Sequence, residues 1–176
     1  LPFQPWNVFM NLPYDFSNRW IKGKPIITMN TSRGCPFHCS FCSVKAIWGY
    51  MYTGFSADRI IEELNYVNNH YSIKGIYFRE DNFTVDKKRV ENFCKGLHKK
   101  NWHLDWVCES RVDSMQDENL VNLMSDSGLK AIYFGVESGS QRILDKLNKA
   151  ITVEQIKKSV SNCKKYGIKV YASLIV

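Results

Sequence analysis

The chain alternates short apolar runs with longer amphipathic stretches. The runs have the length and the β-branched or aromatic content of buried strands, whereas the stretches between them repeat their apolar residues at helical spacing. Strands that alternate with helices in this way predict an α/β fold, in which a parallel sheet has the helices packed outside it. The predicted strands are residues 26–30, 75–80, 103–108, 131–137 and 168–176.

The stretches between the strands carry helix start and stop signals. Polar residues suited to N-caps precede four of them, at Ser56, Asp86, Asp117 and Ser140. The last helix is the best signalled, because Thr152 and Gln155 match a capping box and Gly167 supplies the stop. Its expected inward stripe is Ile156, Val160 and Cys163.

Polar clusters follow four of the predicted strands at the end where each strand stops. Because ligands of parallel α/β sheets bind at the carboxyl ends of the strands, these clusters are expected to share one rim. The competing interpretation makes the acidic residues N-caps or salt-bridge partners, and makes Arg111 a partner of Asp113. The clusters are a loop with three cysteines, Glu80-Asp81-Asn82, Glu109-Ser110-Arg111 and Glu137-Ser138.

The two ends of the chain bear on its domain organisation. Residues 1–25 show neither a period of two nor one of 3.6, and are expected to be a connecting segment that packs on one core domain, residues 26–176. The chain begins with Leu1 and ends inside an apolar run, so we expect an excised part of something longer. The core domain is then incomplete at its C-terminus, and its last strand forms an unprotected edge.

Composition and charge narrow the class of protein. With 44% hydrophobic and 23% charged residues, the 176-residue chain is ordinary for a globular domain. No window holds the roughly 18 consecutive apolar residues of a membrane span, and no signal peptide is recognisable, so a cytoplasmic location is expected. The net charge of +7 falls on basic pairs within helical stretches, which indicates solvated helix faces and no clear nucleic-acid site.

Three of the six cysteines have the spacing of a metal site. Residues 33–42 read RGCPFHCSFC and place Cys35, Cys39 and Cys42 in the pattern C-x₃-C-x₂-C. Three thiolates so spaced can wrap one cuboidal [4Fe–4S] cluster and leave one iron open, whereas the cluster of a ferredoxin is fully capped by cysteine. An open iron is a place where a substrate can coordinate.

Two other interpretations of the cysteines are weaker. Disulfides are typical of short, loop-rich secreted proteins, so a chain full of helix and strand patterns favours a reduced compartment. Structural zinc favours a second Cys or His pair, which the sequence lacks. The remaining cysteines, expected to pack in the core, are Cys94, Cys108 and Cys163.

The cysteine loop resembles the signature of the radical S-adenosylmethionine (SAM) superfamily, with Phe41 as the aromatic residue before the third cysteine. Residues 78–84 (FREDNFT) and 134–140 (FGVESGS) resemble strand motifs of the subgroup that often carries a cobalamin-binding domain upstream. The resemblance covers residues 26–176. It implies a partial (β/α)₆ TIM-like barrel, here truncated near the fifth strand, and a [4Fe–4S] cluster on Cys35, Cys39 and Cys42.

The resemblance also implies a SAM site on the rim. Phe41 is expected to flank the adenine. The run Glu80-Asp81-Asn82 takes the place of a Gly-Gly-Glu run in many relatives and is expected to contact the amino group of the methionine part of SAM. Carboxylates suit the ribose hydroxyls or that amino group. They are supplied by Glu109 and by Glu137, with Ser138 beside it.

The SAM carboxylate needs a positive partner. Lys149 stands twelve residues after Glu137, where relatives commonly have a basic residue, and Arg111 is the alternative. Together these residues make the expected cofactor site.

The implied function is an enzyme that cleaves SAM reductively to a 5′-deoxyadenosyl radical, which abstracts hydrogen from a small-molecule substrate. An electron donor such as flavodoxin or ferredoxin is the implied partner. Methyl transfer or rearrangement assisted by cobalamin, held by a domain outside this segment, is one subtype. A methylthio-transferring or oxidative member acting on RNA or a tetrapyrrole is another. The alternative from a different class is an electron-transfer or binding module that keeps the cluster without cleaving SAM.

Overall fold

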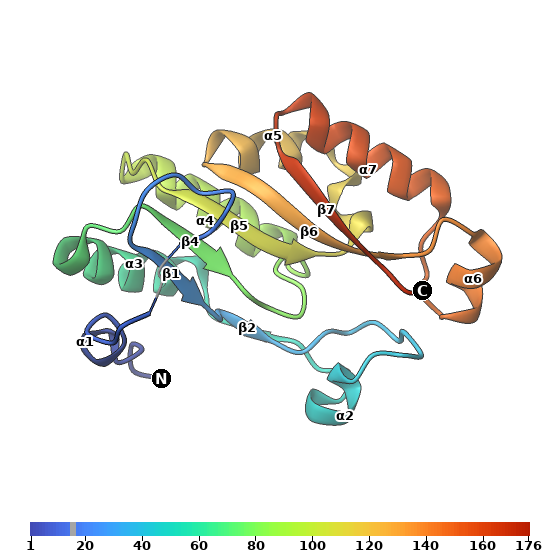
Figure 1. Ribbon diagram of the computed structural model, residues 1–176, viewed down its shortest axis with the longest axis horizontal. Coiled ribbons are helices and arrows are strands. Elements are labelled where there is room, and N and C mark those ends of the chain that lie inside the picture. Colours follow the sequence, from blue (N-terminus) through green and yellow to red (C-terminus); the bar gives the residue numbers. More distant parts are fainter. Residues whose placement is uncertain (15–16) are drawn as a thin grey trace.

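Five parallel strands form one open sheet in the computed structural model, which describes residues 1–14 and 17–176 (Figure 1). Their order in the sheet follows their order in the chain, and each pairs in parallel with the next. The predicted α/β class with a parallel sheet is therefore confirmed. The strands are β1 (Ile26–Met29), β4 (Gly75–Phe78), β5 (Asp105–Ser110), β6 (Leu129–Glu137) and β7 (Lys169–Leu174).

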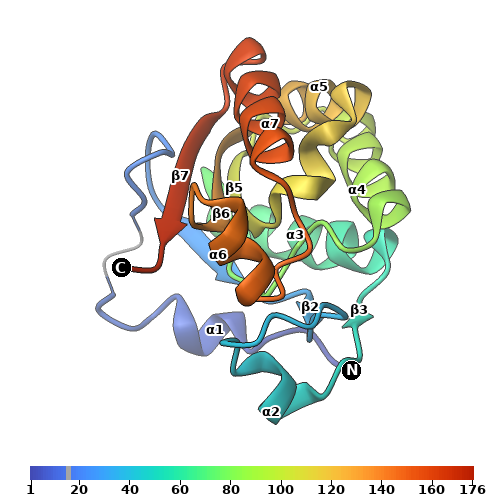
Figure 2. The same cartoon turned by 90° about the vertical axis from the view of Figure 1, so that its right-hand side faces the viewer.

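The longer helices cover one face of this sheet (Figure 2). They are α3 (Ala57–Tyr71), α4 (Lys87–Lys99), α5 (Glu118–Asp126) and α7 (Val153–Lys165), while α6 (Gln141–Lys146) and the 3₁₀ helix η1 (Val112–Gln116) are short connections. Between sheet and helices lies an aromatic cluster whose ring centroids are 4.6–5.9 Å apart. The four rings are fully buried and belong to Phe78, Phe83, Phe93 and Trp106.

The expected helix signals act as caps. The side chains of Ser56, Asp86 and Asp117 each accept a hydrogen bond from a backbone N–H in the first turn of the following helix. Thr152 and Gln155 form the reciprocal capping box of α7. Ser140 makes no such side-chain bond, so the short helix α6 begins without a side-chain cap.

The inward face of α7 differs from the predicted stripe. Cys163 is fully buried, but Ile156 and Val160 are only half-buried, and the other inward positions hold Ser159 and Asn162. Ser159 Oγ donates to the Val112 carbonyl and Asn162 Nδ2 to the Met115 carbonyl, at 2.5 and 2.9 Å. Because α7 packs on the tightly wound η1, it must supply donors to buried carbonyls there, which an apolar stripe cannot do.

The sequence patterns missed the short elements. The segment between β1 and α3 contains α2 (Val44–Trp48) and an antiparallel pair of two-residue strands, β2 (Ser32–Arg33) and β3 (Thr53–Gly54). A helical turn, α1 (Trp6–Phe9), lies in the N-terminal segment. Elements this short contain no full period of apolar residues, so periodicity does not detect them.

The N-terminal segment packs on both faces of the sheet. Trp6 is buried, and its Nε1 donates to Glu63 Oε1 on α3 at 2.8 Å. Ile21 packs against Ile26, Val107 and Ala131 on the face opposite the helices, the inner face. The division of the chain at residues 25 and 26 stays a prediction.

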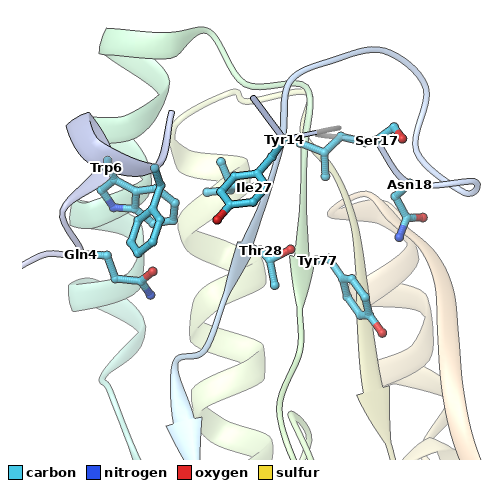
Figure 3. Close-up of a pocket in the computed structure, with 10 residues that line it drawn as sticks. Gln4, Trp6, Tyr14, Ser17, Asn18, Ile27, Thr28 and Tyr77 are labelled. Atoms are coloured by element: carbon cyan, nitrogen blue, oxygen red, sulfur yellow. The ribbon is translucent and has the colours of Figure 1, made fainter. Parts of the chain in front are cut away.

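A pocket of about 400 Å³ separates this segment from β1 (Figure 3). Trp6 faces it from the N-terminal side, and Thr28 and Tyr77 face it from the strands. The pocket lies away from the cysteines, none of which lines it.

The two outer strands of the sheet are β1 and β7. Tyr171 and Leu174 on β7 are 48% and 62% exposed, so the predicted exposed apolar edge is present in the described part of the chain. Of the helices that the structure describes, none has both the length and the apolar character needed to cross a membrane.

Replacing Asn162 by Ala tests the polar contact between α7 and η1. The change leaves buried carbonyls without a donor, so we expect the free energy of unfolding to fall by about 1–3 kcal/mol in urea titrations. The control is Ser161→Ala at an exposed position of the same helix, expected to change it by less than about 0.5 kcal/mol. Equal effects of the two changes would contradict this account.

Candidate functional site

A pocket of about 290 Å³ opens at the carboxyl ends of the parallel strands. All three cysteines of the C-x₃-C-x₂-C loop line it, together with residues at the ends of β4, β5, β6 and β7 and from the connection after α6. The structure thus brings together residues that are more than a hundred positions apart in the chain. The predicted site residues that line it are Cys35, Cys39, Phe41, Cys42, Asp81, Glu109, Arg111, Glu137 and Lys149.

The cysteine loop is held in place by backbone contacts from two sides. On one side, the Ser40 N–H donates to the Leu147 carbonyl at 2.9 Å, and Asn148 Nδ2 donates to the His38 carbonyl at 2.9 Å. On the other, the Gly34 N–H donates to Asp81 Oδ2 at 2.9 Å. The loop therefore bridges the end of β4 and the connection after α6.

Gly34 is required by the shape of this loop. Its φ is +80°, and a Cβ there would lie 2.0 Å from the Met51 carbonyl oxygen. A side chain would therefore clash with backbone as well as strain the dihedral angle.

Arg111 lies directly behind the cysteines. Its Nη1 is 3.7 Å from Cys39 Sγ, its Nη2 donates to the Lys149 carbonyl at 2.8 Å, and its Nε donates to Asp113 at 3.1 Å. The guanidinium carbon lies 3.7 Å from the ring centroid of Phe37. The expected ion pair with Asp113 is present, and the same side chain also reaches the cysteine loop.

Burial and charge act in opposite directions on Cys35. Desolvation is the larger effect and raises the pKa of its thiol above the ordinary value, while a hydrogen bond from the Phe37 backbone and the charge of Arg111 partly offset it.

A buried ion pair lies across the pocket from the cysteines. Lys149 Nζ donates to Glu137 Oε1 at 3.0 Å, and both side chains are about nine-tenths buried. Glu137 itself has a left-handed φ of +67° at the end of β6. A Cβ on Gly135 would lie 2.6 Å from the Glu137 carboxylate and 2.9 Å from Lys149 Nζ, so a larger residue there would displace the ends of both side chains.

Two tyrosines that the sequence analysis did not single out support the pocket from below. Tyr77 donates to Glu109 Oε1 at 2.8 Å, and its ring stacks on Tyr133, which lines the pocket. Burial, then the hydrogen bond to Glu109, raises the pKa of Tyr77, so its phenol stays a proton donor. Tyr77 lies opposite Val107, two residues before Glu109, and Tyr133 lies opposite Glu109, so both share the face of Glu109. The period of two along the strands is the signal that could have found them.

Glu80 does not line the pocket with the cysteines. Its carboxylate accepts hydrogen bonds from the Thr31 N–H at 2.5 Å and from the hydroxyls of Thr31 and Ser32. Arg89 Nη2 lies 3.7 Å away on its other side. The buried carboxylate thus ties the start of the cysteine loop to the end of β4.

Asn82 and Ser138 also make local contacts instead of lining the pocket. Asn82 Oδ1 accepts from the Thr84 N–H and hydroxyl, and the Ser138 hydroxyl accepts from the Ser140 N–H. Asn82 Nδ2 is buried and has no hydrogen-bond partner among the described residues. Of the run 80–82, Asp81 is the residue that faces the cysteines.

The remaining cysteines are in the core, as predicted: Cys94, Cys108 and Cys163 are fully buried. Burial raises the pKa of Cys94 and of Cys163 to about 12, and that of Cys108 well above its ordinary value. These thiols stay protonated near neutral pH and are unsuited to metal binding.

The three cysteine thiols that line the pocket are the donor set of an iron–sulfur cluster. Within the described ranges 1–14 and 17–176, no three His, Cys, Asp or Glu side chains converge as the ligands of one metal ion do. The thiolates of a cuboidal cluster bind different irons and so lie farther apart. Three cysteines on one wall of a shared pocket match that donor set.

Comparison with known sequences finds relatives that are named a methyltransferase and a cyclase. It is 38% identical over 154 residues to an uncharacterized methyltransferase of Pyrococcus horikoshii, covering 88% of this chain and 33% of the relative. It is 29% identical over 172 residues to the anaerobic magnesium-protoporphyrin IX monomethyl ester cyclase of Rubrivivax gelatinosus, covering 97% and 29%. The chain thus spans about a third of the length of these curated relatives.

Solved structures share the fold. The cobalamin-dependent SAM radical enzyme OxsB, with aqua-cobalamin and SAM bound, matches with a TM-score of 0.75 at 24% identity over 84% of this chain and 23% of that one. The radical SAM methyltransferase TsrM of Kitasatospora setae, with cobalamin and a [4Fe–4S] cluster bound, gives 0.74 at 17% identity over 85% and 30%. The sheet and its helices are therefore the partial barrel that the cysteine motif implied.

The family model of the radical SAM superfamily matches residues 29–176. That range contains the cysteine loop, the strands β4, β5, β6 and β7 and all the residues of the rim pocket. The chain belongs to the radical SAM superfamily.

Proposed function

We propose that this chain holds a [4Fe–4S] cluster on Cys35, Cys39 and Cys42, binds SAM beside it, and begins a radical reaction on a small-molecule substrate. The observation that carries the proposal is that the three cysteines and the Glu137–Lys149 pair line one pocket. When bound, the cluster supplies the electron that cleaves SAM reductively and yields a 5′-deoxyadenosyl radical. The protein itself binds, orients and shields the cluster and SAM.

The paired charges suit the methionine part of SAM. An α-amino acid carries an ammonium and a carboxylate on neighbouring atoms, and Glu137 and Lys149 offer the opposite charges 3.0 Å apart. We assign the carboxylate of SAM to Lys149 and the amino group to Glu137. Asp81 strengthens the negative side, although one of its oxygens already accepts from Gly34.

The rest of SAM fits the remaining walls. Glu109, held by Tyr77, offers carboxylate oxygens for the ribose hydroxyls. The Phe41 ring is 44% exposed and lies 5.7 Å from Lys149 Nζ, so it can flank the adenine beside the methionine site. Glu80, Asn82 and Ser138 are assigned supporting roles, because none of them lines the pocket and their side-chain oxygens bond within the protein.

We further propose cobalamin-assisted methyl transfer as the subtype, with cobalamin held by another domain. The support is that a relative 38% identical to the chain is named a methyltransferase. The matched structures of OxsB and TsrM contain cobalamin, and they share the fold of this chain. A ring-forming reaction is the second candidate, favoured by the likeness to a cyclase.

The electron donor and the cellular location belong to the same proposal. A small reduced protein of the flavodoxin or ferredoxin class would supply the electron. All six cysteines are free thiols, and three must stay reduced to bind iron, so we propose the cytoplasm as the location.

Replacing Cys39 by Ala tests the cluster. With one ligand removed, we expect the low-temperature EPR signal of the reduced, reconstituted chain to fall by at least about tenfold, together with SAM cleavage. Cys163→Ala is the control, because it removes a buried thiol outside the pocket and should keep both. Retained cleavage in the Cys39 variant would overturn the cluster assignment.

Replacing Gly135 by Ala tests the charge pair. The new Cβ displaces Glu137 and Lys149, so we expect the Kd for SAM, measured by calorimetry on the cluster-loaded chain, to rise by about tenfold or more while iron content is unchanged. Gly139→Ala is the matched control, since a Cβ there meets no atom within 4 Å. An unchanged Kd in the Gly135 variant would remove Glu137 and Lys149 from the site.

Replacing Tyr77 by Phe tests the support of Glu109. The change deletes one hydrogen bond to a carboxylate, so we expect the Kd for SAM to rise about three- to tenfold. Tyr171→Phe is the control: the Tyr171 ring lies 5.2 Å from that of Tyr133, and loss of its hydroxyl should leave the Kd for SAM unchanged. Equal effects of the two changes would show that Glu109 does not bind SAM.

A further inference from the structure

We infer that Arg111 acts on the cluster and not on SAM: it donates to the thiolate of Cys39 and makes the cluster easier to reduce. The inference rests on the proposed function, since it concerns the same cluster. It separates the two cations of the pocket, Arg111 and Lys149, into different tasks.

The guanidinium of Arg111 is already committed to the protein. Its Nε donates to both Asp113 oxygens at 3.1 and 3.3 Å, and its Nη2 donates to Asp113 Oδ2 at 3.1 Å and to the Lys149 carbonyl at 2.8 Å. Nη1 points to Cys39 Sγ at 3.7 Å. Four of the five N–H bonds thus have partners among the described residues.

One remaining N–H cannot make the two-point grip by which arginine binds carboxylates. That grip is taken by Asp113. The Phe37 ring covers a face of the guanidinium at 3.7 Å, which further fixes its plane. Among the described residues, the Lys149 ammonium in the pocket makes one side-chain hydrogen bond, to Glu137, so it remains able to meet the carboxylate of SAM.

The contact with Cys39 has a definite electrostatic sign. Reduction adds one negative charge to the cluster and its thiolates, and N–H donors and positive charge near a sulfur stabilise that charge. Arg111 and Cys39 are only 5% and 8% exposed, so water screens the interaction weakly. Arg111 therefore shifts the reduction potential of the cluster upward, toward easier reduction.

The test is an EPR-monitored redox titration of the full reconstituted chain and of Arg111→Gln. We expect the ratio of reduced to oxidised cluster at a fixed potential to fall about tenfold in the variant, or about 59 mV for a one-electron couple. Arg59→Gln is the matched control, because Arg59 also pairs with a carboxylate and packs on an aromatic ring, Phe3, away from the cysteines. It should leave the potential unchanged.

SAM binding separates this role from that of Lys149. We expect Arg111→Gln to change the Kd for SAM less than twofold, whereas Lys149→Gln raises it about tenfold and shifts the potential little. An unshifted potential in Arg111→Gln, or a large loss of SAM affinity without a shift, would overturn the inference. If the unmodified chain forms no cluster, it is the proposed function that fails.

Arg111→Lys distinguishes charge from positioning. A lysine keeps the positive charge but cannot bond Asp113, the Lys149 carbonyl and Cys39 together. The reduction potential of the cluster in Arg111→Lys should therefore lie between that of the unmodified chain and that of Arg111→Gln. Loss of the cluster from both Arg111 variants, measured as iron content, would contradict the inference. Arg111 would then build the loop instead of setting the potential of the cluster.

Discussion

The site depends on one buried carboxylate. The cysteine loop contains little regular structure of its own, and Glu80 binds its first residues to the end of β4 through Thr31 and Ser32. A charge at 4% exposure is strongly destabilising unless it is paired and hydrogen-bonded, and here Arg89 and three donors surround it. The loop can therefore leave this position only by exposing an uncompensated charge, so the cysteines stay at the rim.

The need of a buried charge for a partner also determines how the charges are arranged in the pocket. Two cations lie within it, and each is held by its own carboxylate: Lys149 by Glu137, and Arg111 by Asp113. The difference between them is the number of bonds that the protein already makes. Lys149 is held by one contact and can exchange it for a ligand, whereas Arg111 is fixed on several sides and acts where it lies.

Much of the fold and of the site could be predicted from the sequence, because they follow from local patterns. The alternation of apolar runs with amphipathic stretches predicts the parallel sheet, and the caps Ser56, Asp86 and Thr152 mark where helices begin. The rule that parallel strands end at one rim then brings the cysteines near Glu109 and Glu137. Which strand ends gather at the rim could therefore be predicted without knowing any contact.

What could not be predicted depends on partners distant in the sequence. In the run 80–82, neighbouring side chains point in different directions, and no local pattern says that Asp81 faces the cysteines while Glu80 turns to Thr31. Asn162 faces inward on α7 only because the carbonyls of η1 require a donor. These choices are made by tertiary packing, so periodicity predicts the helix and not its polar contacts.

The inner face of the sheet shows why the pocket has a polar floor. The longer helices cover one face of this parallel sheet (Figure 2), and aliphatic side chains on the other face would expose apolar area to the site. Tyr77, Tyr133 and Tyr171 instead form a row of rings whose neighbouring centroids are 5.2–5.7 Å apart. Tyr77 also donates to Glu109 above it, and Trp20 donates to the Tyr133 hydroxyl at 2.9 Å. Tyr133 of this row lines the pocket, and Tyr77 holds a carboxylate that lines it.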